Sequence, residues 1–125
     1  MLSDLEIFAV LPASDLGRAR GFYKDKLGLE PAEERPEGLI YHGKGGSSFL
    51  LYETQFAGTA QNTGMGLVTS DLDGDMTDLR SRGVEFEDYD FPGLKTENGV
   101  ATYGEMRGAW FKDSEGNIVS LTEGT

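Results

Sequence analysis

The sequence predicts an α+β fold built from two tandem units of the same design. The tripeptide Ser-Asp-Leu at residues 14–16 recurs 56 positions later, at residues 70–72. Each copy follows a short apolar run and precedes a helical pattern that a glycine closes. A repeat of this length in a chain of 125 residues leaves room for two units and little else. We therefore expect one domain over residues 1–125, with repeat units at about residues 5–54 and 65–122.

The first unit is predicted to contain one strand, one helix and three further strands. Residues 5–11 form an apolar run of strand length that stops at Pro12. Either Ser14 or Asp15 can cap the helix that follows, and Gly28 can supply its left-handed C-terminal residue. Three short strands are then expected over residues 29–32, 38–42 and 48–54, separated by turns at residues 33–36 and 43–46.

The second unit follows a linker at residues 56–64 and repeats this order less regularly. We expect a strand over residues 65–69, a helix that Ser70 caps and Gly83 ends, and a strand over residues 84–89. Residues 109–112 and 117–122 are expected to form a hairpin across the turn at residues 113–116.

Residues 91–107 have no counterpart in the first unit. The Asn98-Gly99 pair is a strong signal for a tight turn, so we interpret this segment as a small hairpin flap. Extra loops on a duplicated scaffold often carry ligand contacts, although a solvated loop without a role fits the same residues.

Composition excludes several classes of function. The 22 acidic and 11 basic residues give a net charge of −11, which repels nucleic acid backbones and anionic membranes. Such a charge would favour a cationic ligand, although solubility is the simpler explanation when the charge is spread this widely. The absence of cysteine excludes disulfides and thiolate chemistry. Since the N-terminus shows no targeting segment and no long apolar run occurs, we expect a cytoplasmic protein.

Few residues offer catalytic chemistry. His42 is the only histidine, so a histidine-rich metal site within one chain is excluded. Glu53 and Glu105 lie on or beside predicted strands, where a buried carboxylate could act as a base or a ligand. The chain has none of the sequence motifs of serine hydrolases, zinc proteases, or nucleotide-binding loops. We therefore assign no catalytic residue.

Aromatic residues are the remaining candidates for a site. Most aromatic residues on strands belong to the core, but in a sheet curved around a hollow the alternate residues face inward. Several such side chains would line a pocket suited to a planar or hydrophobic ligand. The aromatic residues on or near predicted strands include Phe8, Tyr41, Phe49, Tyr52, Tyr103, Trp110 and Phe111.

The order of these motifs resembles the vicinal oxygen chelate superfamily. The motifs are Ser-Asp-Leu at each helix start, Phe-Tyr within the first helix, Leu-Gly-Leu after it, and AWFKDSEGNIVSL at residues 109–121. This superfamily includes glyoxalase I, extradiol dioxygenases, and fosfomycin and bleomycin resistance proteins. The resemblance implies paired βαβββ units that curl an eight-stranded mixed sheet into a cup, with helices outside and the ligand inside. It also implies a homodimer, and the cup can close within one chain or between chains that exchange halves.

The resemblance further implies metal ligands on the first and last strand of each unit. In this chain those positions hold mostly residues that cannot bind a cation, and only Glu53 would be a conventional ligand. We therefore expect no metal and no cofactor, as in the metal-free, bleomycin-resistance-like branch. The matching positions are Phe8, Gly64 or its neighbour Met65, Ser120, and one of Leu51, Tyr52 and Glu53.

We expect a metal-free protein that binds a hydrophobic or aromatic small molecule. A positive charge on this ligand would suit the acidic chain. The alternative is an enzyme of the lyase, isomerase or dioxygenase type, with a displaced metal site made of Glu53, Glu105 and His42, or with metal-free acid–base catalysis by one of them. A purely structural role is the third hypothesis. The candidate ligand-binding residues are Phe8, Tyr52, Trp110 and Ser120 in the cup, Tyr103 on the flap, and His42 and Glu53.

Overall fold

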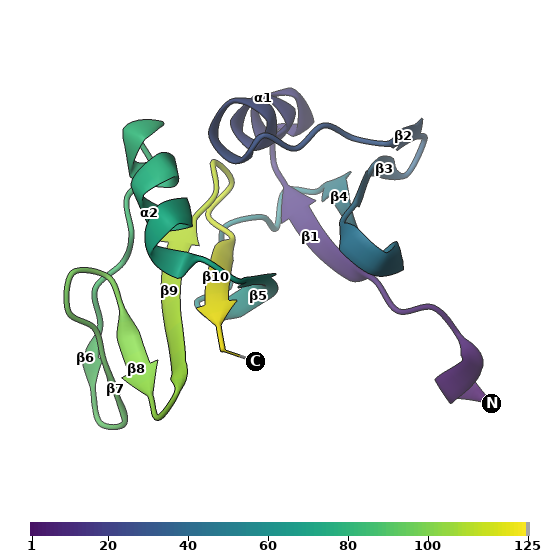
Figure 1. Ribbon diagram of the computed structural model, residues 1–125. Helices are drawn as coiled ribbons and strands as arrows, with labels where there is room; N and C mark the ends of the chain where they lie inside the picture. The colour runs from purple at the N-terminus through teal and green to yellow at the C-terminus, as the bar shows by residue number, and fades with distance from the viewer. Residues whose placement is uncertain (125) are drawn as a thin grey trace.

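The computed structural model describes residues 1–124 and contains two βαβββ units, the first on the right and the second on the left in Figure 1. The strands of the first unit form a mixed sheet in the order β1-β4-β3-β2, with β1 parallel to β4. Two short 3₁₀ turns, Leu2–Asp4 and Lys44–Gly46, flank this sheet. The elements of the first unit are β1 Ala9–Ala13, α1 Leu16–Leu27, β2 Glu33–Arg35, β3 Gly38–His42 and β4 Ser48–Glu53.

The second unit repeats this topology in the order β5-β10-β9-β8, again with its first and last strands parallel. A separate two-stranded hairpin, β6 and β7, is inserted before β8. These elements are β5 Thr63–Thr69, α2 Leu72–Ser81, β6 Asp90–Phe91, β7 Leu94–Lys95, β8 Ala101–Tyr103, β9 Met106–Lys112 and β10 Ile118–Glu123. The predicted α+β class and the two βαβββ units are thereby confirmed.

The two sheets remain separate within one chain, although their edge strands β1 and β5 lie side by side. Their helix-bearing faces share one hydrophobic core, in which Tyr23 and Leu51 of the first unit join Phe111 and Val119 of the second. Since both sheets turn these faces toward a common core, their opposite faces point away from it. We call the opposite face of each sheet its outer face.

Both helices begin and end much as their sequences predict. Asp15 caps α1 by accepting a hydrogen bond from the backbone N–H of Arg18, and Gly28 ends the helix with φ of 69°. Asp71, and not the expected Ser70, caps α2, because the Asp71 carboxylate accepts from the N–H of Gly74.

The first strand differs from its prediction. Strand β1 begins at Ala9 and continues through Pro12 to Ala13, whereas a proline was expected to stop it. Because β1 is an edge strand of its sheet, a residue without an N–H is tolerated there. The carbonyl of Pro12 also accepts a hydrogen bond from the Asn117 side-chain amide, across the two units.

Two other strand predictions were wrong. Strand β2 occupies residues 33–35, where a turn was expected, and residues 29–32 are not a strand. The exposed, charged residues of this edge strand give no apolar signal. Residues 84–89 make a single bridge, Phe86 with Phe111, in place of a strand, and β8 within the predicted flap completes the second sheet.

Within residues 1–124, neither helix combines the length and the apolar composition that a bilayer-crossing helix needs.

Candidate functional site

The outer face of the first sheet carries several exposed apolar side chains. Residues of β1 and β4 lie side by side in register, Val10 with Leu50 and Pro12 with Tyr52. Strand alternation places all four on the outer face, because their neighbours Leu11 and Leu51 belong to the core. Phe8, just before β1, has 54% of its surface exposed, and Tyr52 has 37%.

The sequence-predicted residues of this sheet do not all lie together. His42 pairs with Ser48 at the start of β4, whereas Tyr52 lies near the end of that strand. The His42 imidazole is 3.9 Å from the Glu33 carboxylate. Glu53 is exposed, and strand alternation directs it to the side opposite Tyr52.

The outer face of the second sheet brings Trp110 and Ser120 together. Ser120 lies between Trp110 of β9 and Gly66 of β5 in one row of the sheet. A β-carbon at Gly66 would lie 3.0 Å from the Ser120 hydroxyl, so the glycine keeps this hydroxyl uncovered on that side. Tyr103 lies on the same face at the edge of the sheet, where it pairs with Met106.

A cavity of about 580 Å³ lies over the part of the second sheet that carries Trp110, but Ser120 and Tyr103 do not line it. Tyr89 and Trp110 meet edge to face at a centroid distance of 5.7 Å, and Phe91 stacks on Tyr89 at the same distance. Residues of the linker between the units, from Gly58 to Asn62, also line this cavity. Sequence reasoning missed Tyr89 and Phe91 as site residues, because Tyr89 ended the strand predicted over residues 84–89, Phe91 began the predicted flap, and neither pattern places them beside Trp110.

Hydrogen bonds hold this aromatic wall in place. The Thr96 hydroxyl accepts from the backbone N–H of Tyr89 at 2.7 Å and donates to the Asp88 carboxylate at 2.8 Å. The N–H of Gly99 also donates to Asp88, and these two hydrogen bonds lower the pKa of Asp88. Burial raises the pKa of Tyr89, so its phenol is neutral at physiological pH.

The residues at the positions of the superfamily's metal ligands do not fit a divalent cation. Phe8 and Gly64 offer no side-chain donor, and a β-carbon at Gly64 would lie 3.0 Å from a methyl group of Leu11. Ser120 offers one neutral hydroxyl, whereas divalent cations need several oxygen or nitrogen donors. Across residues 1–124, no three histidine or carboxylate side chains converge as metal ligands, so His42, Glu53 and Glu105 are not brought together.

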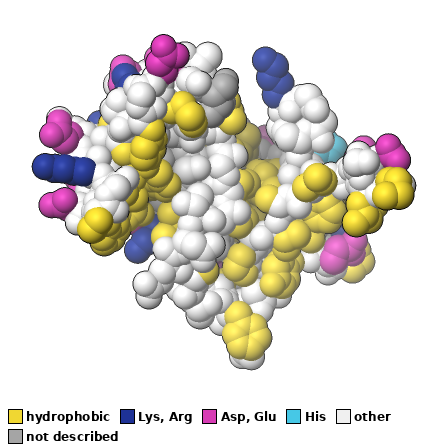
Figure 2. Space-filling model, turned by 90° about the horizontal axis from the view of Figure 1, so that it is seen from below, with side chains coloured by type: hydrophobic (Ala, Val, Ile, Leu, Met, Phe, Trp, Pro, Cys, Tyr) yellow, Lys and Arg dark blue, Asp and Glu magenta, His cyan; other side chains and the backbone are white. Residues whose placement is uncertain are grey.

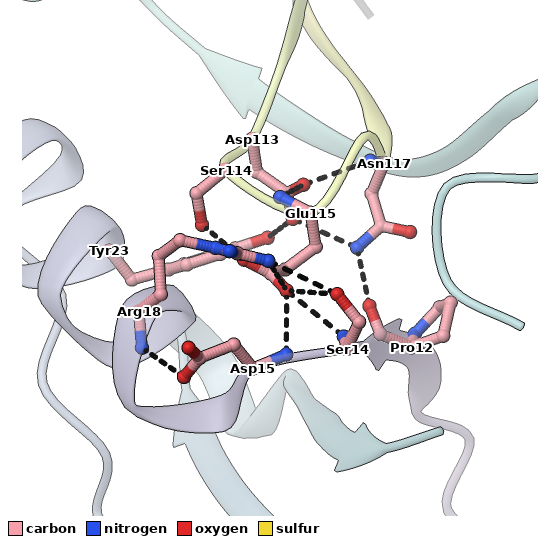
Figure 3. Close-up of polar contacts among 9 residues, drawn as sticks. All are labelled: Pro12, Ser14, Asp15, Arg18, Tyr23, Asp113, Ser114, Glu115 and Asn117. Carbon is pink, nitrogen blue, oxygen red and sulfur yellow. Dashed lines mark hydrogen bonds and ion pairs between the residues drawn. The ribbon is translucent and has the colours of Figure 1, made fainter. Parts of the chain in front are cut away.

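A polar network fixes the two units relative to each other (Figure 3). The Glu115 carboxylate, on the turn between β9 and β10, accepts from the backbone N–H groups of Ser14 and Asp15, both at 3.0 Å. It also pairs with the Arg18 guanidinium at 2.9 Å. Burial opposes ionisation of this carboxylate, but these donors and the Ser114 hydroxyl outweigh it and lower the pKa of Glu115 to about 2.

Asp113, on the same turn, makes a second connection between the units. The buried Tyr23 hydroxyl donates to its carboxylate at 2.7 Å, and burial raises the pKa of Tyr23 so that this proton is retained. The side-chain amide of Asn117 donates both to Asp113 and to the carbonyl of Pro12. The hairpin turn is thereby attached to both β1 and α1 of the first unit.

Comparisons with known proteins agree with this architecture. An antibiotic-binding protein, TnmS3 from Streptomyces sp. CB03234, is 26% identical with a TM-score of 0.74 over 97% of this chain and 98% of its own. A glyoxalase/bleomycin resistance protein from the same organism is 28% identical with a TM-score of 0.67 over 90% and 94% of the two chains. A third, from Catenulispora acidiphila DSM 44928, is 24% identical with a TM-score of 0.72 over 97% and 99% and shows the shared fold.

None of the curated proteins compared with this chain matches it. The family model of the Glyoxalase/Bleomycin resistance protein/Dioxygenase superfamily matches residues 7–121. That match spans both βαβββ units, and the chain belongs to the Glyoxalase/Bleomycin resistance protein/Dioxygenase superfamily.

Proposed function

We propose that this protein binds a hydrophobic or aromatic small molecule on its outer faces, without the metal of the superfamily's enzymes. The observation that carries this proposal is the aromatic wall of Tyr89, Phe91 and Trp110 around the cavity of about 580 Å³. Such a volume is typical of sites for drug-sized ligands, and aromatic edges and faces bind planar molecules well. Ser120 neighbours Trp110 in the sheet but is not among the residues that line this cavity.

The side chains at the positions of the superfamily's metal ligands support ligand binding rather than catalysis. Metal-dependent members of such a family need a cation to polarise substrate oxygens. Here three of the four corresponding positions hold a phenyl ring, a glycine and a single hydroxyl, and at the fourth only Glu53 would be a conventional ligand. The net charge of −11 also makes a positively charged ligand more favourable than an anionic one.

A second copy of the chain is expected to complete the site. The outer faces of the two sheets point away from their shared core, so one chain does not enclose a ligand between them. Both faces carry exposed apolar side chains, including Val10 at 49% and Val68 at 73% exposed. Seen from below, apolar side chains are exposed in two areas, one on each unit's side (Figure 2). We therefore propose a homodimer in which the first sheet of one protomer faces the second sheet of its partner.

The similarity to an antibiotic-binding protein supports a ligand of that class. Because Trp110 is the only tryptophan, its fluorescence reports directly on the proposed site. The test is a titration with bleomycin and a panel of planar aromatic antibiotics, followed by calorimetry on the wild type and on Trp110→Ala. We expect saturable quenching and an affinity loss of about tenfold or more in the variant, since a central aromatic contact contributes on the order of 2 kcal/mol.

Thr102→Ala is the matched control, because strand alternation places Thr102 on the opposite side of β8 from Tyr103. Binding should be the same before and after dialysis against a chelator. The proposal would be abandoned if no ligand in the panel bound, or if the purified protein took up a stoichiometric metal ion on which binding depended.

A further inference from the structure

A second cavity, of about 560 Å³, lies between the two units. Its walls are apolar side chains on the helix-facing side of the sheets, which is the side opposite the outer faces. Phe49 and Leu27 line it from the first unit, and Leu67, Leu79, Phe111 and Leu121 line it from the second. The cavity is therefore distinct from the one beside Trp110, which does not line it.

Part of the lining is small or is backbone. Ala9 at the start of β1 adds only a methyl group, and Gly64 and Gly66 of β5 line the cavity with their backbone. These residues belong to the two edge strands that lie side by side without pairing. A volume of this size is ample for a small organic molecule.

The charged groups on the lining are acidic. Asp75 and Asp78 of α2 line the cavity, and residues three apart lie on the same face of a helix. Arg82 neutralises part of this charge, because its guanidinium is 3.2 Å from Asp78. Asp75 accepts a hydrogen bond from the neutral Thr69 hydroxyl and has no ion pair with any described residue.

No lysine or arginine is among the described residues that line the cavity, and His42 is the one other titratable group there. By contrast, arginine or lysine lines both the pocket beside α2, which contains Arg80, and the cavity beside Trp110, which contains Lys112. An apolar interior with carboxylates on its lining complements an apolar molecule that carries one positive charge.

We propose that this inter-unit cavity binds a small apolar amine, with its chain among the core side chains and its ammonium group at Asp75. The proposal does not depend on the outer-face site. The two sites differ in their walls, and the chain supplies a separate probe for each.

Met65 and Trp110 report on the two cavities separately, because each lines only one of them. Met106, exposed at the edge of the second sheet, lines neither cavity and gives the reference methyl signal. The experiment follows both ¹³C-methyl signals, assigned by Met→Leu variants, while octylamine is added to the full chain. Octanol and octanoate serve as the neutral and anionic matched probes.

We expect octylamine to shift the Met65 signal saturably and to bind about fivefold more tightly than octanol, with octanoate the weakest of the three. Asp75→Asn should remove most of the preference for the amine. Asp73→Asn is the matched control, since Asp73 lies on the same helix but pairs with Arg107 and does not line the cavity.

The wild-type comparison of the three probes decides the question even if a variant fails to fold. Equal affinity for octylamine and octanol would overturn the role of Asp75. A Met65 signal that none of the probes moves would overturn the cavity as a binding site, whatever happens at Met106. Loss of antibiotic binding at Trp110 would leave these outcomes unchanged, so the two proposals fail separately.

Discussion

Glu115 is the residue through which the second unit holds the start of α1. Its side chain is fully buried, and it accepts hydrogen bonds from two backbone N–H groups while pairing with Arg18. The first turn of a helix has unpaired N–H groups and a partial positive charge, so a carboxylate at this point is stabilising. Glu115 therefore contributes both to α1 and to the contact between the units.

Glu115→Gln should lower the free energy of unfolding by about 2 kcal/mol, because an amide leaves Arg18 without its anionic partner and places an N–H₂ group against other donors. Urea denaturation monitored by circular dichroism measures this change. Glu105→Gln is the matched control at an exposed turn and should change stability by less than about 0.5 kcal/mol. Equal effects of the two substitutions would contradict the role given to Glu115.

The pH dependence of stability should report on the same carboxylate. Its pKa in the folded protein is lowered from 4.5 to about 2. A lowered pKa means that the ionised form stabilises the fold above about pH 4.5, and this contribution is lost as the pH falls toward 2. Denaturation curves at a series of pH values should therefore show a smaller loss between pH 4.5 and 2 for Glu115→Gln than for the wild type.

At the scale of elements, the features that depend on local sequence patterns were predicted correctly. The features that depend on contacts with neighbouring elements were missed. Asp15 and Gly28 limit α1 through side-chain and backbone preferences that act within a few residues, and the structure confirms both. Pro12 is tolerated only because β1 lies at a sheet edge. Strand β2 pairs through its backbone while its charged side chains remain exposed, so its sequence has no alternating hydrophobic pattern that would predict a strand.

The segment that carries the aromatic wall shows the same limit. Trp110 was predicted as an aromatic residue on a strand and Ser120 as the position of a metal ligand in the superfamily, and the strand register places the two side by side. Tyr89 lies in an irregular stretch, and its place beside Trp110 depends on the Thr96 and Asp88 hydrogen bonds. Contacts that depend on hydrogen bonds within an irregular segment cannot be predicted from a single sequence.

Substitutions of two glycines in this segment test how tightly the segment packs against its neighbours. Both Gly93 and Gly99 have positive φ, at 84° and 82°, so alanine is strained at each by about 1 kcal/mol. Only at Gly99 would the new β-carbon also approach a neighbour, the Cβ of Phe86 at 3.0 Å, whereas the space at Gly93 is open. Gly99→Ala should therefore destabilise the protein by at least about 1 kcal/mol more than Gly93→Ala in thermal unfolding.

At the scale of the whole molecule, duplication explains why one chain has two sheets that each carry a helix on one face only. Each unit covers one face of its sheet with its own helix and with the other unit, as the shared core shows. Among residues 1–124, the only elements that lie over the remaining faces of the sheets are the linker and the β6–β7 hairpin. The sequence could not choose between a cup closed by one chain and a cup shared by two, because both use the same elements.

Val10 offers a direct test of the shared cup. Its side chain is 49% exposed on the outer face of the first sheet, so Val10→Asp should leave the folded protomer nearly as stable as before. In a dimer that covers this face, the same substitution buries an unpaired carboxylate and should weaken association by on the order of a hundredfold. Light scattering and sedimentation over a range of concentrations measure the assembly, and Val10→Thr is the control of similar shape without charge.

Because the proposed site takes one wall from each protomer, ligand binding should fall together with the fraction of dimer. A wild type that stays monomeric yet binds its ligand at Trp110 would show instead that the second sheet and its flap suffice.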